Sequence, residues 1–391
     1  MGATETSTGI SFALSEEQRA LRELSREFAE KEIRPVAADY DERSQHPADV
    51  IAKAHEVGLM NPHIPEELGG PGLSAFEQIL IGEELAWGCS GIATSIVANI
   101  LGSLPVLLAG TDEQKRGWLA PLLAEPLLCS FALTEPGAGS DVSAIQTTAV
   151  RDDGNYVLNG SKMFITNAGE AAWFVVFAAT DRQAGHRGLS AFVVPADSNG
   201  IVVEQHLDKL GQRATDTSAL AFQDVRVPVE NRLGAEGEGF KTAMRTLDLT
   251  RPGTAAGAVG VARAAFEHAI EYSKSRVQFG QPIAINQGVN FLVADMAAEI
   301  EAARLLTWQA AWLIDEGKRA TLQSSFAKRF AADTAMKVTT DAVQIFGGYG
   351  YMKEYPVEKL MRDAKLFQIY EGTSQIQRLV IAREIFLPRD G

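Results

Sequence analysis

Three short polar segments with glycines interrupt apolar stretches of this chain, and their residue types suit chemistry. The first is Phe131–Asp141, with the sequence FALTEPGAGSD. Its Pro-Gly-Ala-Gly run would leave backbone N–H groups free to bind a flat, oxygen-rich ligand. A tight turn between two domains would use the same residues, so this segment alone does not decide between binding and structure.

The second segment, Arg276–Pro282, combines a cation, an amide and an aromatic ring in the sequence RVQFGQP, directly after a helical stretch. A charge-assisted contact from Arg276 could hold a phosphate group. An arginine that balances the dipole at the C-terminus of a helix explains the same pattern equally well.

The third segment places an acid among apolar residues. Gln344–Gly350 is followed by Tyr370–Gln375, where the lone carboxylate of Glu371 stands between an apolar stretch and a Gly-Thr turn. Burial raises the pKa of a carboxyl group into the range that is useful for a general base. A glutamate at the start of a helix, close to Thr373, is the structural alternative.

Several other common sites are missing from the sequence. It has no G-x-x-x-x-G-K-[ST] loop, no H-E-x-x-H motif, no paired C-x-x-C and no G-x-S-x-G elbow, and its six histidines are scattered. The glycines at 137–139 and 253–260 do not fit G-x-G-x-x-G after a strand. We therefore expect no metal site, no P-loop and no Rossmann-type dinucleotide site.

The composition is that of an ordinary globular protein. Among 391 residues, 36 are basic and 50 acidic, and the net charge of −14 argues against nucleic-acid binding or an anionic membrane surface. Two cysteines fit a reducing compartment. With no targeting signal visible, we expect a cytoplasmic protein or a mature form in the mitochondrial matrix. The uncharged run 85–111 is broken by glycines and Pro105, so we interpret it as a buried helix and expect no membrane insertion.

The elements that must position these segments fall into three parts. Residues 1–125 are predicted to be helical, beginning with a capping box at Ser15–Gln18. Residues 126–235 contain short runs of β-branched and aromatic residues between turns, which predict an antiparallel sheet, a sandwich or a barrel. Residues 236–391 contain long runs at helical spacing, which predict a bundle. The expected fold class is therefore α+β.

Taken together, the segments resemble the acyl-CoA dehydrogenase family, and the similarity runs from about Phe12 to Phe386. Four signatures occur in the order and spacing of the family: Leu133–Asp141, Gln344–Gly348, Arg362–Lys365 and Tyr370–Thr373. Three further stretches look closest to its medium-chain and short-chain, straight-chain branch: 60–65, 84–89 and 354–359. The family fold comprises an N-terminal all-α domain, a middle antiparallel β-domain and a C-terminal four-helix bundle, in agreement with the three parts above.

The resemblance implies an activity. Family members remove the α and β hydrogens of an acyl-CoA thioester, giving trans-2-enoyl-CoA and reduced FAD. Glu371 matches the base that takes the α-proton, and its backbone N–H matches a donor to the thioester oxygen. One branch of the family carries its base at the position of Thr250, which here has no carboxylate, so the resemblance leaves Glu371 as the base.

The resemblance also assigns residues to FAD. Matches to flavin contacts are Phe131, Leu133, Thr134, Ser140, Phe164 and Thr166. Close relatives commonly carry Trp at position 164, and Phe keeps the stacking face without the N–H. Other residues match family positions that contact the FAD pyrophosphate, the adenosine end or the far side of the catalytic base, and some of these positions reach the cofactor of a neighbouring subunit. They are Arg276, Gln278, Phe279, Asn286, Gln287, Gln344, Ile345, Gly347, Gly348, Thr373 and Gln375.

Substrate and partners follow from the same resemblance. Matches to substrate contacts are Ser140, Asp248, Arg251, Tyr370 and Gly372. The family passes electrons to an electron-transfer flavoprotein, forms homotetramers that are dimers of dimers, and serves fatty-acid β-oxidation or related acyl-CoA catabolism. Thr94, Val97 and Leu101 lie at helical spacing and could line the path of the acyl tail, or could simply pack in the core. We expect straight-chain substrates of short to medium length.

Two alternatives to a dehydrogenase stay open. An oxidase of the same fold would give its electrons to oxygen, but such oxidases usually carry an additional C-terminal domain that this sequence does not contain. A non-catalytic flavoprotein, such as a DNA-associated offshoot of the fold, is disfavoured by the acidic charge balance and by Glu371.

Overall fold

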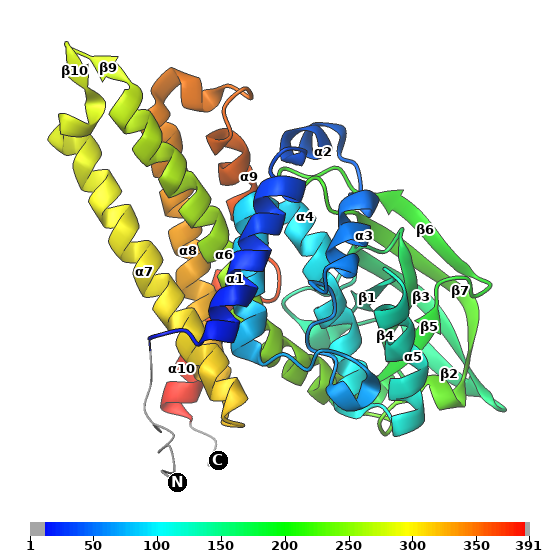
Figure 1. Cartoon of the computed structure of the whole chain (residues 1–391). Coiled ribbons are helices and arrows are strands. Elements are labelled where there is room, and N and C mark those ends of the chain that lie inside the picture. Colours follow the sequence, from blue (N-terminus) through cyan, green and yellow to red (C-terminus); the bar gives the residue numbers. More distant parts are fainter. Residues whose placement is uncertain (1–11, 388–391) are drawn as a thin grey trace, which may run out of the picture.

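The computed structural model describes residues 12–387, which form helices, then an eight-stranded sheet, then helices again (Figure 1). This order confirms the predicted architecture. The N-terminal helices are α1 (Glu16–Phe28), α2 (Ala37–Arg43), α3 (Ala48–Glu56), α4 (Ala75–Ala109) and α5 (Asp112–Ala124). The predicted capping box is present, because Ser15 and Gln18 each accept a hydrogen bond from the other's backbone N–H.

Helix α4 is the central element of the N-terminal part. Cys89 has the extended backbone angles φ −167° and ψ 118°, so α4 consists of two helical pieces joined at that residue. By length and composition alone it could cross a membrane. In this fold it packs along α6 and α1, and its buried Glu83 and Glu84 pair with arginines of the C-terminal helices. Helix α4 is therefore an interior helix, as the sequence predicts.

The sheet is mixed, which corrects the expectation of a purely antiparallel domain. Its strands are β1 (Leu128–Ala132), β2 (Thr148–Asp152), β3 (Asn155–Thr166), β4 (Ala171–Ala179), β5 (Leu189–Pro195), β6 (Ile201–His206), β7 (Thr217–Pro228) and β8 (Arg232–Leu233). The order is β6-β7-β3-β2-β4-β5-β8, with antiparallel neighbours except that β4 pairs in parallel with β1 and, at one residue, with β2. The long connection through the β2–β3 hairpin makes the parallel β1–β4 pairing possible.

The C-terminal part is a helical bundle. Its helices are α6 (Gly239–Ser275), α7 (Gln287–Asp315), α8 (Thr321–Phe346), α9 (Val357–Phe367) and α10 (Ser374–Phe386). Helices α6, α7 and α8 pack on one another, and α9 and α10 both pack on α8. A small hairpin, β9 (Val277–Gln278) with β10 (Gln281–Pro282), caps the far end of the bundle (Figure 1).

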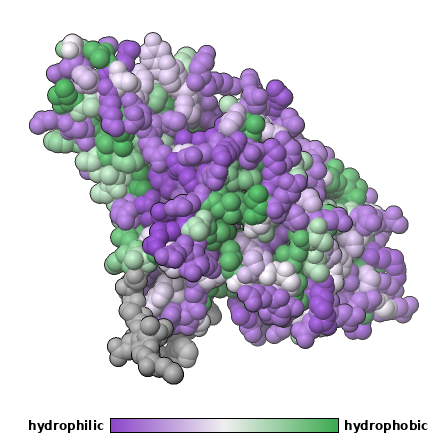
Figure 2. All heavy atoms as spheres, viewed as in Figure 1, coloured by the Kyte–Doolittle hydropathy of each residue, from purple (hydrophilic) through white to green (hydrophobic). Residues whose placement is uncertain are grey.

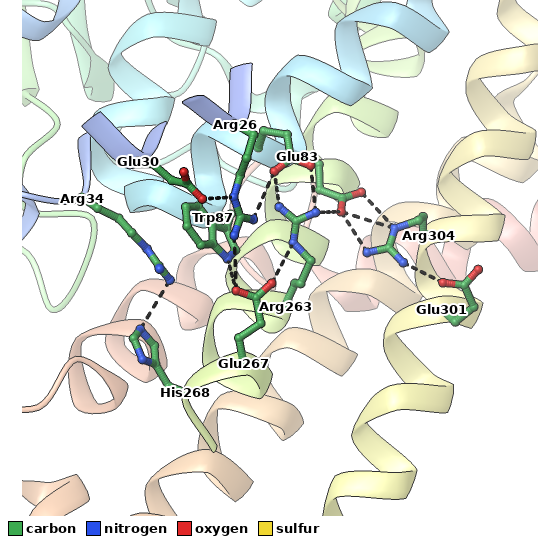
Figure 3. A network of polar contacts seen from close by, with 11 residues as sticks. Arg26, Glu30, Arg34, Glu83, Trp87, Arg263, Glu267, His268, Glu301 and Arg304 are labelled. Atoms are coloured by element: carbon green, nitrogen blue, oxygen red, sulfur yellow. Dashed lines mark hydrogen bonds and ion pairs between the residues drawn. The ribbon is translucent and has the colours of Figure 1, made fainter. Parts of the chain in front are cut away.

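The two helical parts share one core through α4 and α6. A Cβ atom at Gly260 would lie 2.2 Å from the carbonyl oxygen of Glu83, so the two backbones meet where only glycine fits. Beside this contact, Figure 3 shows a network of charged side chains around Trp87. Arg263 bonds both Glu83 and Glu84, and Arg304 also bonds Glu83. Charges from α1, α4, α6 and α7 thus neutralise one another inside the protein.

Candidate active site

Glu371 lies in the turn between α9 and α10, in an unusual backbone conformation. Its φ is +52° and that of Gly372 is +88°, so two consecutive residues are left-handed. The half-buried carboxylate accepts a hydrogen bond from the Thr250 hydroxyl of α6 at 2.8 Å. Burial raises the pKa of Glu371, while Thr250 and the nearby Lys328 oppose that rise. Such an environment suits a proton acceptor.

The turn is held by side chains from two helices. Gln377 of α10 donates to the carbonyl oxygens of Glu371 and Gly372 at 3.2 and 3.0 Å. Lys328 of α8 donates to the Gly372 carbonyl at 2.5 Å. A Cβ at Gly372 would lie 2.7 Å from the Gln377 amide nitrogen, so glycine is required there by both space and φ.

Tyr370 joins this turn to the other two parts of the protein. Burial raises the pKa of its hydroxyl, and the nearby Gln212 and Thr94 oppose that rise. Thr94 also donates to the Gln212 side-chain oxygen at 3.0 Å, and the Gln212 backbone donates to Asp363 of α9 at 2.5 Å. The candidate site therefore lies where the N-terminal helices, the middle sheet and the bundle meet.

The residues proposed for the acyl path lie on the same side of α4. Thr94, Val97 and Leu101 are half-buried, whereas Ser95 and Ile96 between them are fully enclosed. This exposure pattern fits both a surface that borders the acyl tail and ordinary packing in the core.

The predicted flavin residues of the middle part lie side by side. The Met163 backbone donates to the Thr134 carbonyl at 2.9 Å, and Ser130 donates to the Thr166 carbonyl at 2.7 Å. Segments 131–134 and 163–166 are therefore neighbours. Asn167 donates to the Ser95 carbonyl at 2.9 Å, which brings the pair of segments to α4.

A buried ion pair supports these segments and was not found by sequence reasoning. Lys162 donates to Glu135 at 2.8 Å and to the Leu133 carbonyl at 3.0 Å, and the same carboxylate accepts the backbone N–H groups of Gln146 and Thr147. Burial lowers the pKa of Lys162 to about 8. For Glu135, the Lys162 charge and these hydrogen bonds outweigh burial and lower the pKa.

The surface above this support fits a planar, acceptor-rich cofactor such as FAD. Phe164 is 64% exposed, and its backbone is left-handed, with φ +61°. An added Cβ at Gly137 or Gly139 would meet no atom within 4 Å, so the backbone there is open to a ligand. Phe131, Leu133, Thr134 and Thr166 belong to the neighbouring segments 131–134 and 163–166, and Ser140 directly follows Gly139.

The second predicted group lies elsewhere. A cavity of about 500 Å³ near the β9–β10 hairpin is lined by Arg276, Gln278, Ile345, Gly347 and Gly348, among others. Phe279 at the hairpin tip is 99% exposed, Asn286 and Gln287 begin α7 beside it, and Gln344 is exposed near the end of α8. Within one chain this end of the bundle lies far from the sheet, so the structure does not bring the two groups together (Figure 1).

The remaining predicted residues surround the Glu371 turn. Thr373 is the N-cap of α10, and Gln375 is exposed on its first turn. Arg251 is 4% exposed and pairs with Asp248 at 2.5 Å, so its guanidinium points into the protein. Among residues 12–387, no group of three or more His, Cys, Asp or Glu side chains could hold a metal ion.

Comparison with known proteins identifies the family. Profiles of the acyl-CoA dehydrogenase N-terminal, middle and C-terminal domains match residues 15–126, 130–225 and 237–386. The short-chain specific acyl-CoA dehydrogenase of Clostridium acetobutylicum is 46% identical over 379 residues, covering 96% of this chain and 100% of that protein. The chain belongs to the acyl-CoA dehydrogenase family. It is therefore an oxidoreductase of this class, as the resemblance implied.

Three solved acyl-CoA dehydrogenase-like structures are close to this one. Butyryl-CoA dehydrogenase of Megasphaera elsdenii has a TM-score of 0.94 at 44% identity and covers 96% of this chain and 100% of its own. A chain in a structure described as the electron transferring flavoprotein of Acidaminococcus fermentans has a TM-score of 0.95 at 46% identity, with 97% and 100% coverage. The prolyl acyl carrier protein oxidase AnaB has a TM-score of 0.93 at 31% identity, with 96% and 100% coverage.

Proposed function

We propose that this acyl-CoA dehydrogenase uses FAD to convert straight-chain acyl-CoA thioesters of short to medium length into trans-2-enoyl-CoA. The observation that carries the proposal is the half-buried Glu371 carboxylate in its left-handed turn, at the junction of all three parts of the fold. The similarity to short-chain and butyryl-CoA dehydrogenases supports the substrate class.

The residues of the chain have distinct roles in this proposal. Glu371 takes the α-proton, and its backbone N–H holds the thioester oxygen as negative charge develops there. Tyr370, Gly372, Asp248, Arg251 and Ser140 surround the thioester and the CoA moiety. Thr94, Val97 and Leu101 border the acyl tail. FAD, when bound, supplies the acceptor for the β-hydride.

The flavin site follows the two groups described above. Phe131, Leu133, Thr134, Ser140, Phe164 and Thr166 hold the flavin end, with the Glu135–Lys162 pair beneath them. The cavity at the hairpin, with the residues already named there, receives the pyrophosphate and adenosine end from a neighbouring subunit. Ile285 and Phe291 are also exposed at this end, where Figure 2 shows apolar atoms scattered among hydrophilic ones, in keeping with subunit contacts in a homotetramer.

The cross-subunit assignment can be tested with Arg276→Ala. Loss of a charge-assisted contact to a phosphate should reduce the bound FAD and loosen the assembly together. Flavin content and mass by light scattering measure both effects. Lys274→Ala, two residues earlier on the exposed end of α6, is the matched control. A variant with full FAD that remains tetrameric would contradict the assignment.

The electron acceptor is proposed to be an electron-transfer flavoprotein, which the Acidaminococcus similarity favours. The sequence argument against an oxidase was that such oxidases usually carry an additional C-terminal domain. The similarity to AnaB removes this argument, because that oxidase is matched over its whole chain. Anaerobic mixing with acyl-CoA thioesters of four to sixteen carbons, ranked by kcat/KM, tests the substrate. Air is then admitted: a dehydrogenase should stay bleached until the acceptor protein is added, and an oxidase should recover its colour quickly.

A further inference from the structure

Lys328 is a buried cation that the proposed roles above do not use. It lies in the first half of α8 with 0% exposure. Among residues 12–387 its ammonium forms one hydrogen bond, to the Gly372 carbonyl at 2.5 Å, and no ion pair. A buried ammonium without a compensating negative charge is strongly disfavoured. The position of Lys328 therefore calls for an explanation.

Glu371 supplies the compensating charge. Burial lowers the pKa of Lys328 to about 8, and the Glu371 carboxylate is the main influence against that lowering. The effect is reciprocal, since the Lys328 charge holds down the pKa of Glu371 against burial. The two groups form a separated pair across the Glu371–Gly372 turn.

The other charges around Glu371 are already neutralised. On α6, Arg251 pairs with Asp248 at 2.5 Å. On α8, Asp333 pairs with Arg378 of α10 at 2.8 Å and with Arg329 of its own helix at 3.3 Å. Gln377 of α10 bonds the Glu371 carbonyl, and Thr94 of α4 and Gln212 of the middle part lie beside the adjacent Tyr370; all three are uncharged. Among the described residues, Lys328 is thus the cation facing Glu371 that has no carboxylate bound to it.

The Lys328 contact also bears on the conformation of the turn. Two consecutive left-handed residues, the first of them not glycine, persist only where surrounding contacts hold them. The Gly372 carbonyl receives two side-chain donors, Lys328 and Gln377, and no other side chain bonds it in the described part of the chain. Movement of this carbonyl would displace both the Glu371 backbone N–H and its carboxylate.

We propose that Lys328 is a positioning residue for Glu371: its ammonium fixes the turn through the Gly372 carbonyl and keeps the adjacent carboxylate ionised. This role rests on the proposed function, in which Glu371 must be ionised to accept a proton. Removal of the charge should raise the pKa of Glu371, and the rate should then fall at the acid end of the pH range.

Two substitutions separate the effect of the hydrogen bond to the Gly372 carbonyl from the effect of the Lys328 charge. Lys328→Gln keeps a hydrogen-bond donor and loses the charge, whereas Lys328→Met, of similar length, loses both. In anaerobic stopped-flow experiments with butyryl-CoA, both variants should shift the acid limb of flavin reduction upward by about one unit or more. Lys328→Met should in addition lower the plateau rate. Lys337→Met, on the exposed part of α8, should leave the profile unchanged.

A second readout does not depend on turnover. Infrared difference spectra between each protein and its Glu371→Gln counterpart report the protonated carboxyl band of Glu371 as the pH is varied. The midpoint should lie higher in both Lys328 variants than in the wild type. If the midpoints coincide, the proposal is wrong, even where the rates differ. If butyryl-CoA fails to bleach the wild type while the midpoints shift, the proposed function fails and the Lys328–Glu371 coupling stands.

Discussion

The carboxylates of two charged clusters differ in how many cationic partners they bind. In the network around Trp87, Glu83 and Glu84 each receive guanidinium groups, and the ion pairs raise the pKa of Arg263 and Arg304 despite burial. In the turn between α9 and α10, the carboxylate of Glu371 receives a threonine hydroxyl, and burial raises its pKa. Carboxylates that bind helices together are saturated with partners. A carboxylate left undersaturated is free to accept a proton.

Glu371→Gln should produce the largest effect. The amide keeps the size and the backbone N–H of the residue but cannot accept a proton, so flavin reduction should fall by roughly 10²–10⁴-fold or more. Stopped-flow bleaching with butyryl-CoA measures the rate, with FAD content as the check on folding. Bleaching within tenfold of the wild-type rate would show that the base lies elsewhere.

Arg263→Met should cause the largest loss of stability. Among the described residues, Glu84, 3% exposed, would keep one ion pair, with the Arg26 guanidinium at 3.4 Å. Breaking a buried pair from one side typically costs about 3–5 kcal/mol. Urea denaturation at fixed protein and FAD concentrations measures this loss. Lys31→Met, which removes an exposed pair with Glu27, should leave the midpoint unchanged. Equal midpoints for both variants would refute the contrast.

Glu371→Gln should have the opposite sign of effect on stability. A carboxyl group whose pKa is raised by folding binds its proton more tightly in the native state, so its contribution to stability is lost as the pH rises through the folded-state pKa. At pH 8 the wild type carries this cost and the glutamine variant does not. Melting temperatures at pH 5 and pH 8 should show the advantage of the variant growing with pH. A constant difference would contradict the raised pKa.

Thr250→Val should have the smallest effect. It removes the hydroxyl that donates to Glu371 at 2.8 Å and keeps the shape of the side chain. A lost hydrogen bond to a charged group should raise the Glu371 pKa by about one unit, which gives a roughly tenfold slower reduction on the acid limb only. Thr340→Val, exposed on α8, is the control. A slower rate at every pH would point to displaced packing.

The three-part fold could be predicted because its signals are local, whereas the roles of the site residues come from the family resemblance and stay predictions. Periodicity, capping residues and glycine-bearing turns mark helices, strands and the Glu371 turn along the chain itself. The parallel pairing joins β1 and β4, which the β2–β3 hairpin separates along the chain, and no local pattern encodes such a contact.

Lys328 was missed for a related reason. Alanines at 327, 331 and 335 place it on a buried, small-residue face of α8, and a lysine on such a face was a usable signal. What it faces, however, comes from a turn 44 residues away. The Glu135–Lys162 pair likewise joins residues that only the folded sheet brings together.

The backbone contact at Gly260 has a consequence for dynamics. Helix α4 carries Thr94 against Tyr370, and α6 carries Thr250 against Glu371. Gly260 meets Glu83 in the piece of α4 that precedes Cys89, so that piece and α6 cannot slide past each other without breaking the core between them. The amide protons of α6 and of this first piece of α4 should therefore exchange with solvent through one shared, rare opening. Any change in the separation of Thr94 and Thr250 is then left to the break at Cys89, which divides Thr94 from the part of α4 that is fixed to α6.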